Sequence, residues 1–131
     1  MKQPLSYSQR LHHREDFEAA LKKKAISEKW LAVHLELNTK GTDRLGIIVT
    51  KRIISKAVAR NKIKRQIREV FRTSRFSQTG AFDIVVRLRK NVLANETQEF
   101  RRTLSYLLMK ARKTENDASA PNVHKDLSVS D

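Results

Sequence analysis

Basic side chains are concentrated in one stretch of the sequence, AVARNKIKRQIREVFR. Residues 51–75 contain ten basic residues and one acid, Glu69. In a helix, Arg60, Lys64 and Arg68 form an i,i+4 row of like charges, which destabilises the helix by about 0.2–0.5 kcal/mol per pair. We therefore expect a polyanion to neutralise this face of the helix. Nucleic acid is the polyanion that best matches such a concentrated cationic field.

An ordinary solvated helix face and a membrane-surface helix are the alternatives to a nucleic-acid interface. A solvated face usually mixes positive and negative charges, and this one does not. A membrane-surface helix needs hydrophobic anchors beside its cations. The apolar positions Ala59, Ile63, Ile67, Val70 and Phe71 instead form one stripe of the kind that faces a protein core. These observations favour nucleic acid.

Single-stranded RNA is a better match than the DNA major groove. Predicted strands flank the basic helix, so the second helix of a helix-turn-helix motif is not visible. Phe17 and Trp30 could stack on unpaired bases, with His34 on the same strand face as Trp30. Each could equally have an ordinary structural role: core packing for Phe17, covering of a strand end for Trp30, and a solvated strand position for His34.

The sequence predicts no catalytic residue and no metal site on the protein. A metal-dependent nuclease needs converging carboxylates or histidines. Here the acids are scattered, and His12 and His13 are neighbours whose side chains point apart on any regular element. The absence of cysteine excludes disulfides, thiolate metal sites and a cysteine nucleophile.

Hydrophobic periodicity predicts the elements that position these residues. Strict alternation marks the segment KWLAVHLELN as a strand with one apolar face, and i,i+4,i+7 spacing marks the last helix as amphipathic. The expected order is a helix at 14–24, strands at 29–38 and 44–50, the basic helix at 55–72, a strand at 82–88, and a helix at 95–113.

This order predicts one α+β domain, with a three- or four-stranded sheet packed on helices. The first two strands are expected to form an antiparallel pair. We expect Ser55 and Asn95 to cap their helices. The predicted divisions are a loosely ordered arm at 1–12, the α+β domain at 13–113 and a disordered polar tail at 114–131. The sequence shows no secretory signal or membrane-spanning run, and we expect a cytoplasmic protein.

Four blocks of sequence in the same order resemble the protein subunit of bacterial ribonuclease P. The signature block KRIISKAVARNKIKRQIREVFR contains an Arg-Asn pair, Lys-Arg two residues later, and then Arg with an acid. The flanking blocks are LHHREDFEAAL, LGIIVTKR and FDIVVRLRK. The resemblance covers about residues 9–111.

The resemblance implies a fold similar to a small-subunit ribosomal protein domain, with a left-handed crossover. It also implies a protein that pairs with a large catalytic RNA, in a holoenzyme that cleaves precursor tRNA to form the mature 5′ end. In that family the RNA and its bound Mg²⁺ carry out the chemistry. The protein neutralises backbone repulsion and grips the single-stranded 5′ leader. No obligate protein partner and no membrane are implied.

Residue by residue, the resemblance assigns two groups. Phe17 matches an aromatic of the leader groove, Leu21 sits where some members have a second aromatic, and the groove residue on the first strand corresponds to His34 or Val33. With Trp30, these residues form the predicted leader groove. The predicted RNA-binding residues are Lys51, Arg52, Lys56, Arg60, Asn61, Lys64, Arg65, Arg68 and Arg72. The competing prediction is a non-catalytic RNA-binding module, such as a ribosomal or assembly protein, which would bind RNA without improving cleavage.

Overall fold

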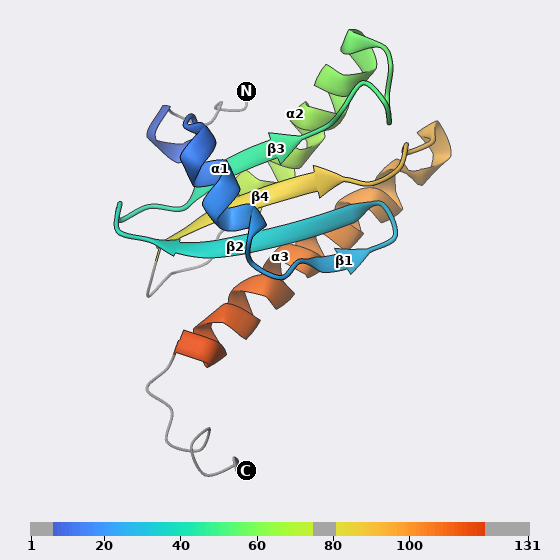
Figure 1. The fold of residues 1–131 in the computed structure, drawn as a ribbon. Coiled ribbons are helices and arrows are strands. Elements are labelled where there is room, and N and C mark those ends of the chain that lie inside the picture. The colour runs from blue at the N-terminus through green and yellow to red at the C-terminus, as the bar shows by residue number, and fades with distance from the viewer. Residues whose placement is uncertain (1–6, 75–80, 120–131) are drawn as a thin grey trace.

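The computed structural model describes residues 7–74 and 81–119 and has an α+β fold, as predicted (Figure 1). A four-stranded sheet is packed between helices. The short strand β1 was not predicted. The elements in chain order are α1 (Arg14–Leu21), β1 (Ile26–Glu28), β2 (Leu31–Asn38), β3 (Arg44–Ile48), α2 (Ala57–Thr73), β4 (Ala81–Leu88) and α3 (Thr97–Ser119), with single 3₁₀ turns at Tyr7–Gln9 and Ala94–Glu96.

The strand order in the sheet is β1-β2-β4-β3. β4 pairs antiparallel with β2 and parallel with β3. The predicted antiparallel pairing of the segments 29–38 and 44–50 is therefore wrong, because β4 lies between them. The physical reason is the apolar run in β4, where residues 82–86 are all buried. A strand that is buried on both faces belongs in the middle of a sheet.

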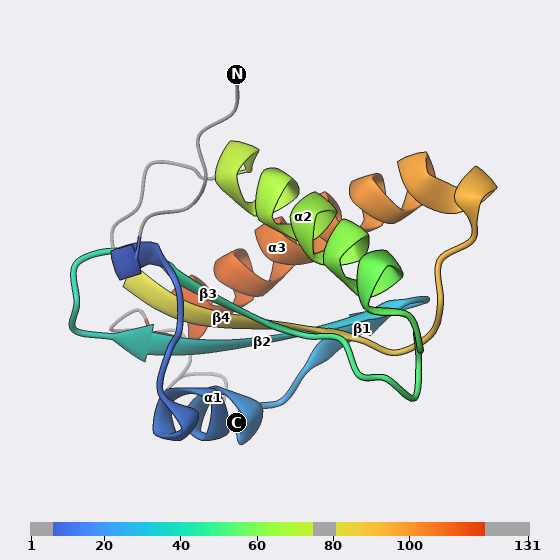
Figure 2. The same ribbon diagram turned by 90° about the horizontal axis from the view of Figure 1, so that it is seen from above.

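The connection from β3 through α2 to β4 is a crossover between parallel strands. When α2 faces the viewer and both strands point up, the chain moves from β3 on the right to β4 on the left (Figures 1 and 2). The crossover is therefore left-handed, whereas such connections are almost always right-handed. This agrees with the handedness that the resemblance implies.

The helices cover opposite faces of the sheet, with α2 and α3 on one face and α1 on the other (Figure 2). The main core lies on the α2–α3 face, where the predicted apolar stripes of both helices are buried. Its largest fully buried side chains are those of Trp30, Phe71, Phe82 and Phe100. Burying such a side chain stabilises the fold by about 1.5–3 kcal/mol. The α1 face has a smaller core of Leu11, Ala20 and Val85.

The helix boundaries differ from the predictions at their caps. Lys56, rather than Ser55, occupies the N-cap position of α2, and its side chain makes no capping bond. The α3 helix follows a 3₁₀ turn in which the amide of Leu93 donates to Glu96 Oε1 at 2.9 Å, so Asn95 is not the cap. The Glu96 carboxylate accepts the amide of Leu93, three residues earlier, and thus takes the capping role expected of Asn95.

Regular backbone structure extends past both boundaries of the predicted domain. The amide of Leu11 donates to the carbonyl oxygen of Leu45 at 2.9 Å, and Arg10 forms a parallel bridge with Leu45. At the other end, α3 continues to Ser119, past the boundary predicted at residue 113. Positions 1–6 of the predicted arm and 120–131 of the predicted tail lie outside the described residues. Within the described part of the chain, no helix is long and apolar enough to cross a membrane.

Candidate nucleic-acid interface

The outward face of α2 carries the predicted cations. Asn61, Lys62 and Arg65 are exposed, whereas Lys64 and Arg68 are half-buried at the border with the sheet. The opposite face of the helix is anchored in the main core. Because its apolar face is packed in the core, α2 holds its basic side chains in fixed positions on the outward face.

Two charged residues of α2 are engaged within the protein. Arg60 Nη1 donates to the carbonyl oxygens of Ile54 at 3.1 Å and Ser55 at 2.8 Å, so this side chain fastens the segment that enters the helix. Glu69 pairs with Arg101 of α3 at 3.3 Å. An RNA contact by the rest of the Arg60 guanidinium stays a prediction.

The other predicted cations extend along the same crossover. Lys51, Arg52 and Lys56 are exposed in the connection that leads from β3 into α2. Arg72 is half-buried in the last turn of the helix. The signature residues thus follow one continuous path from the end of β3 to the C-terminal turn of α2.

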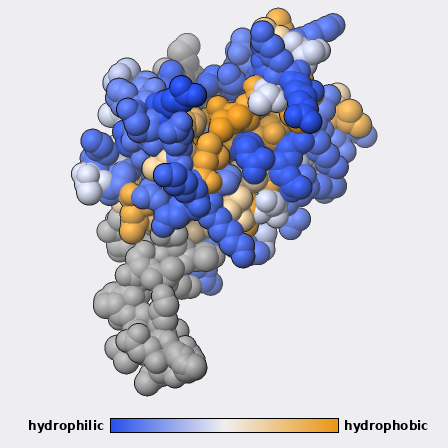
Figure 3. Space-filling view, viewed as in Figure 1, coloured by the Kyte–Doolittle hydropathy of each residue, from blue (hydrophilic) through white to orange (hydrophobic). Residues whose placement is uncertain are grey.

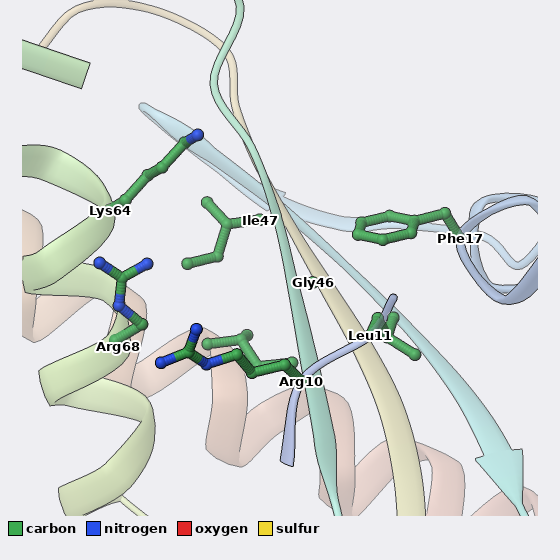
Figure 4. Close-up of a pocket in the computed structure, with 8 residues that line it drawn as sticks. Arg10, Leu11, Phe17, Gly46, Ile47, Lys64 and Arg68 are labelled. Atoms are coloured by element: carbon green, nitrogen blue, oxygen red, sulfur yellow. The ribbon is translucent and has the colours of Figure 1, made fainter. Parts of the chain in front are cut away.

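A pocket with a volume of about 180 Å³ lies between α2 and the edge of the sheet. Figure 4 shows Lys64 and Arg68 of α2 on one side of β3, with Arg10 beside them and Phe17 on the other side of the strand. The lining residues are Arg10, Leu11, Phe17, Leu45, Gly46, Ile47, Lys64 and Arg68, and they include three cations but no carboxylate. Arg10 and Gly46 were not predicted from the sequence.

Burial and nearby like charges both disfavour the positive charge of Arg68. Partial burial lowers the pKa of the Arg68 guanidinium below its ordinary value, and the nearby charges of Arg10 and Arg65 lower it further. The shift leaves arginine protonated at physiological pH. A bound anion would offset the burial and like-charge repulsion of this guanidinium.

Phe17 reaches β3 because position 46 is glycine. A Cβ atom on Gly46 would lie 2.5 Å from Phe17 Cε1, closer than carbon atoms can approach. The phenyl ring therefore lies directly against the strand backbone. A glycine inside an apolar strand is the sequence signal for such a close approach, and it could have identified this position.

The α1 side of the sheet carries an apolar surface. Figure 3 shows a hollowed band of hydrophobic surface on this side, flanked by hydrophilic side chains. Phe17, Leu21 and Ile48 are half-buried against the small core on this face. Two of the predicted groove residues, Phe17 and Leu21, are thus brought together on one face of α1.

The other two predicted groove residues, Trp30 and His34, are buried, so neither offers an exposed stacking surface in this structure. Trp30 is fully buried in the main core, with its ring centroid 5.9 Å from that of Phe100. It precedes β2 and follows Lys29, whose φ is 48°, so the alternation of the strand does not extend to it. His34 is only 6% exposed, and its Nδ1 lies 2.9 Å from the carbonyl oxygen of Lys23. The segment that follows α1 thus contacts this ring.

The carboxylates nearest the sheet are engaged in ion pairs. Asp83 pairs with Arg44 through two hydrogen bonds of 2.8 and 2.7 Å, and Asp16 of α1 lies 3.4 Å from the same guanidinium. The bonds to Asp83 raise the pKa of Arg44 above its ordinary value. This cluster fixes α1 against β3. Among the described residues, no group of three or more histidines and carboxylates could hold a metal ion.

Known proteins similar to this chain share one family. The family described as Ribonuclease P matches residues 5–112. The ribonuclease P protein component of Nitrosomonas eutropha is 38% identical over 112 residues, covering 83% of this chain and 92% of the relative. The RNase P protein of Staphylococcus aureus superposes with a TM-score of 0.68 at 32% identity, covering 79% of this chain and 95% of that structure. That of Thermotoga maritima gives a TM-score of 0.60 at 33% identity, with coverages of 80% and 96%.

Proposed function

The chain belongs to the ribonuclease P protein family, and from this membership we propose that it is the protein subunit of ribonuclease P. In this role it binds a catalytic RNA and the 5′ leader of precursor tRNA. It supports the endonucleolytic removal of the leader, which gives the mature 5′ end of the tRNA. We place this activity in the cytoplasm, where tRNA is processed in bacteria.

The structural observation that supports this proposal is that two unlike surfaces lie on either side of β3. On one side, the cations of α2 offer a charged face that suits RNA phosphates. On the other side, Phe17 and Leu21 offer an apolar surface that suits unstacked bases. A single strand that crosses this edge of the sheet can contact both surfaces at once.

The protein's part in catalysis is to bind and to neutralise charge. When Mg²⁺ is bound by the partner RNA, it supplies the metal-assisted chemistry of phosphodiester hydrolysis. Three of the described acids, Asp16, Asp43 and Asp83, are held in ion pairs with arginines, so these three do not form a converging set of metal ligands. The protein's cations lower the repulsion between the phosphates of the leader and those of the catalytic RNA.

Replacement of Phe17 by alanine tests the groove. We expect the holoenzyme carrying Phe17→Ala to bind leader-bearing precursor tRNA more weakly by about 1–3 kcal/mol, the usual cost of losing one base–aromatic stack. Its affinity for leaderless tRNA should hardly change. Titration of labelled substrates with and without the leader measures both values.

Tyr106→Ala is the matched control, because Tyr106 is a 47% exposed aromatic on α3 and lies outside the groove. This control should bind both substrates as the wild type does. Equal losses for the leader-bearing and leaderless substrates with Phe17→Ala would contradict a leader groove at this position.

A further inference from the structure

Arg10 lies outside the basic signature, yet the backbone holds it at the edge of β3. The amide of the next residue, Leu11, donates to the carbonyl oxygen of Leu45 at 2.9 Å, and Arg10 itself forms a parallel bridge with Leu45. The Leu11 side chain is 7% exposed and packs in the small core on the α1 face. Because neighbouring side chains of an extended segment point to opposite sides, burial of Leu11 directs Arg10 away from α1.

The direction of Arg10 brings three cations from two distant parts of the sequence together. Figure 4 shows the guanidinium of Arg10 reaching toward Arg68, with Lys64 one helical turn along α2. All three residues line the pocket of about 180 Å³. That volume is well above the roughly 30 Å³ of a water molecule, so a tetrahedral anion has room to enter.

The open edge of β3 adds a directional donor to the pocket. The carbonyl oxygen of Leu45 points away from β4, because it accepts the hydrogen bond from Leu11. Backbone groups two residues apart in a strand point the same way, so the amide of Ile47 faces the same open edge. Ile47 also lines the pocket. The carbonyl oxygen of Ile47 faces this edge as well, so the strand offers one N–H donor beside two guanidinium groups and an ammonium group, which are donors that a phosphate prefers.

The unfavourable surroundings of the Arg68 charge also indicate an anionic ligand. Partial burial disfavours the charge of Arg68 most, the like charges of Arg10 and Arg65 add to this, and no carboxylate lies among the described lining residues. Stabilisation of the fold does not explain why Arg10 lies beside Lys64 and Arg68. A bound anion does, because it attracts all three cations and offsets the repulsion between them.

We infer that Arg10, Lys64 and Arg68 form a pocket for one phosphodiester group of an RNA strand at the edge of β3. The inference rests on the proposed function and adds a residue of the N-terminal arm to the RNA-binding surface. The phosphodiester group belongs either to the 5′ leader, as it crosses from α2 to the groove beside Phe17, or to the catalytic RNA. The chemistry of recognition is the same in both cases.

The test compares Arg10→Ala and Arg10→Lys with Arg14→Ala. Arg14→Ala removes the same charge close by in the sequence, from a side chain that is 88% exposed and pairs with Glu18. Circular dichroism melts first establish that all the variants fold. Fluorescence anisotropy then gives the affinity of each protein alone for a labelled single-stranded RNA of about ten nucleotides, over a series of KCl concentrations.

We expect Arg10→Ala to weaken RNA binding about tenfold, as for loss of one charged hydrogen-bonding contact. Its salt slope should decrease by about 0.7, the value for one single-strand phosphate. Arg10→Lys should keep most of the affinity, and Arg14→Ala should resemble the wild type. Loss of affinity in Arg10→Ala no greater than in Arg14→Ala would overturn the pocket.

Two further arms of the experiment identify the strand. In one arm, a single uncharged methylphosphonate is moved along the leader of precursor tRNA bound to the holoenzyme. If the leader supplies the phosphodiester, a methylphosphonate at one position should weaken binding to the wild-type holoenzyme but not to the Arg10→Ala holoenzyme. In the other arm, assembly of each variant with a bacterial ribonuclease P RNA is measured without substrate. If the catalytic RNA supplies the phosphodiester, Arg10→Ala weakens this assembly instead.

The outcomes separate this inference from the proposed function. Wild-type protein that binds the short RNA but does not support cleavage by any bacterial ribonuclease P RNA would contradict the proposed function, and the anisotropy comparison would still decide the pocket. Wild-type protein that supports cleavage, with an Arg10→Ala variant equal to Arg14→Ala in every arm, would overturn the pocket alone.

Discussion

At the scale of single residues, similar cations on one helix have different surroundings. The Arg60 guanidinium holds the backbone that enters α2, whereas Lys64 and Arg68 line the pocket beside β3. The sequence identifies all three as basic positions of one row. It does not distinguish them, because the carbonyl oxygens that Arg60 binds belong to a connection whose path depends on the fold.

The parts of the candidate site that depend on residue spacing within one element were predictable from the sequence. The helical spacing of Phe17 and Leu21 places them together, and the structure agrees. The burial of Trp30 was missed because a turn with a left-handed residue precedes β2 and ends the alternation. Arg10 was missed because its position depends on a pairing with Leu45, which is far away in the sequence.

Gly46→Ala tests the close approach of Phe17 to the strand. The added Cβ would lie 2.5 Å from Phe17 Cε1, so the ring must move away from β3. We expect a loss of about 1–3 kcal/mol in the free energy of unfolding, as for other overpacked sites, and weaker binding of leader-bearing substrate. Chemical denaturation and substrate titration measure the two effects.

The double variant Gly46→Ala with Phe17→Ala provides the control for this prediction. Removing the ring removes the clash, so the stability losses of the two single changes should not add. Fully additive losses would mean that the methyl group clashes with the backbone or with Leu11 instead.

At the scale of elements, periodicity predicted the helices better than the sheet. The stripes of α2 and α3 are local patterns, and both are buried where expected. The pairing of strands is a non-local property. The apolar strand β4 lies between β2 and β3, so those two strands do not pair with each other. The left-handed crossover was implied by the resemblance alone, since no local pattern in a sequence encodes handedness.

One buried ion pair joins α3 to the connection between β2 and β3. Arg112 Nη2 donates to Asp43 Oδ2 at 2.6 Å, and the two side chains are 7% and 1% exposed. Asp43 Oδ1 also accepts the amide of Phe82 at 3.0 Å. A single carboxylate therefore links the last helix, the β2–β3 connection and the start of β4.

Arg112→Met should destabilise the protein by about 3–5 kcal/mol, because it leaves the buried carboxylate without its cation. The double variant Asp43→Asn with Arg112→Met removes both charges and keeps a side-chain acceptor for the Phe82 amide. It should be more stable than Arg112→Met alone. Urea denaturation of the three proteins measures these differences, and an Arg112→Met protein as stable as the wild type would show that the pair contributes little.

At the scale of the whole molecule, part of the formal charge of +14 lies at one edge of the sheet, where Arg10, Lys64 and Arg68 line the pocket. The β3 strand separates the cations of α2 from the apolar surface beside α1 (Figure 4). Composition predicted the polyanion partner, whereas the fold determines that both surfaces meet at this edge.

The salt dependence of RNA binding measures how many phosphates this charge neutralises. Contact with about six phosphates of a single strand predicts a slope of about −4 for log affinity against log salt concentration. Affinity measurements at several KCl concentrations give the slope. A slope near zero would contradict an interface based on phosphate contacts.

The most direct test of the proposed function is cleavage of a precursor tRNA by a bacterial ribonuclease P RNA at low Mg²⁺, with and without this protein. We predict that the protein restores cleavage at the mature 5′ end. The charge-reversed double variant Lys64→Glu with Arg68→Glu should fold and fail to restore it. Tight RNA binding by the wild-type protein without restored cleavage would contradict the proposed function and would indicate a non-catalytic RNA-binding module.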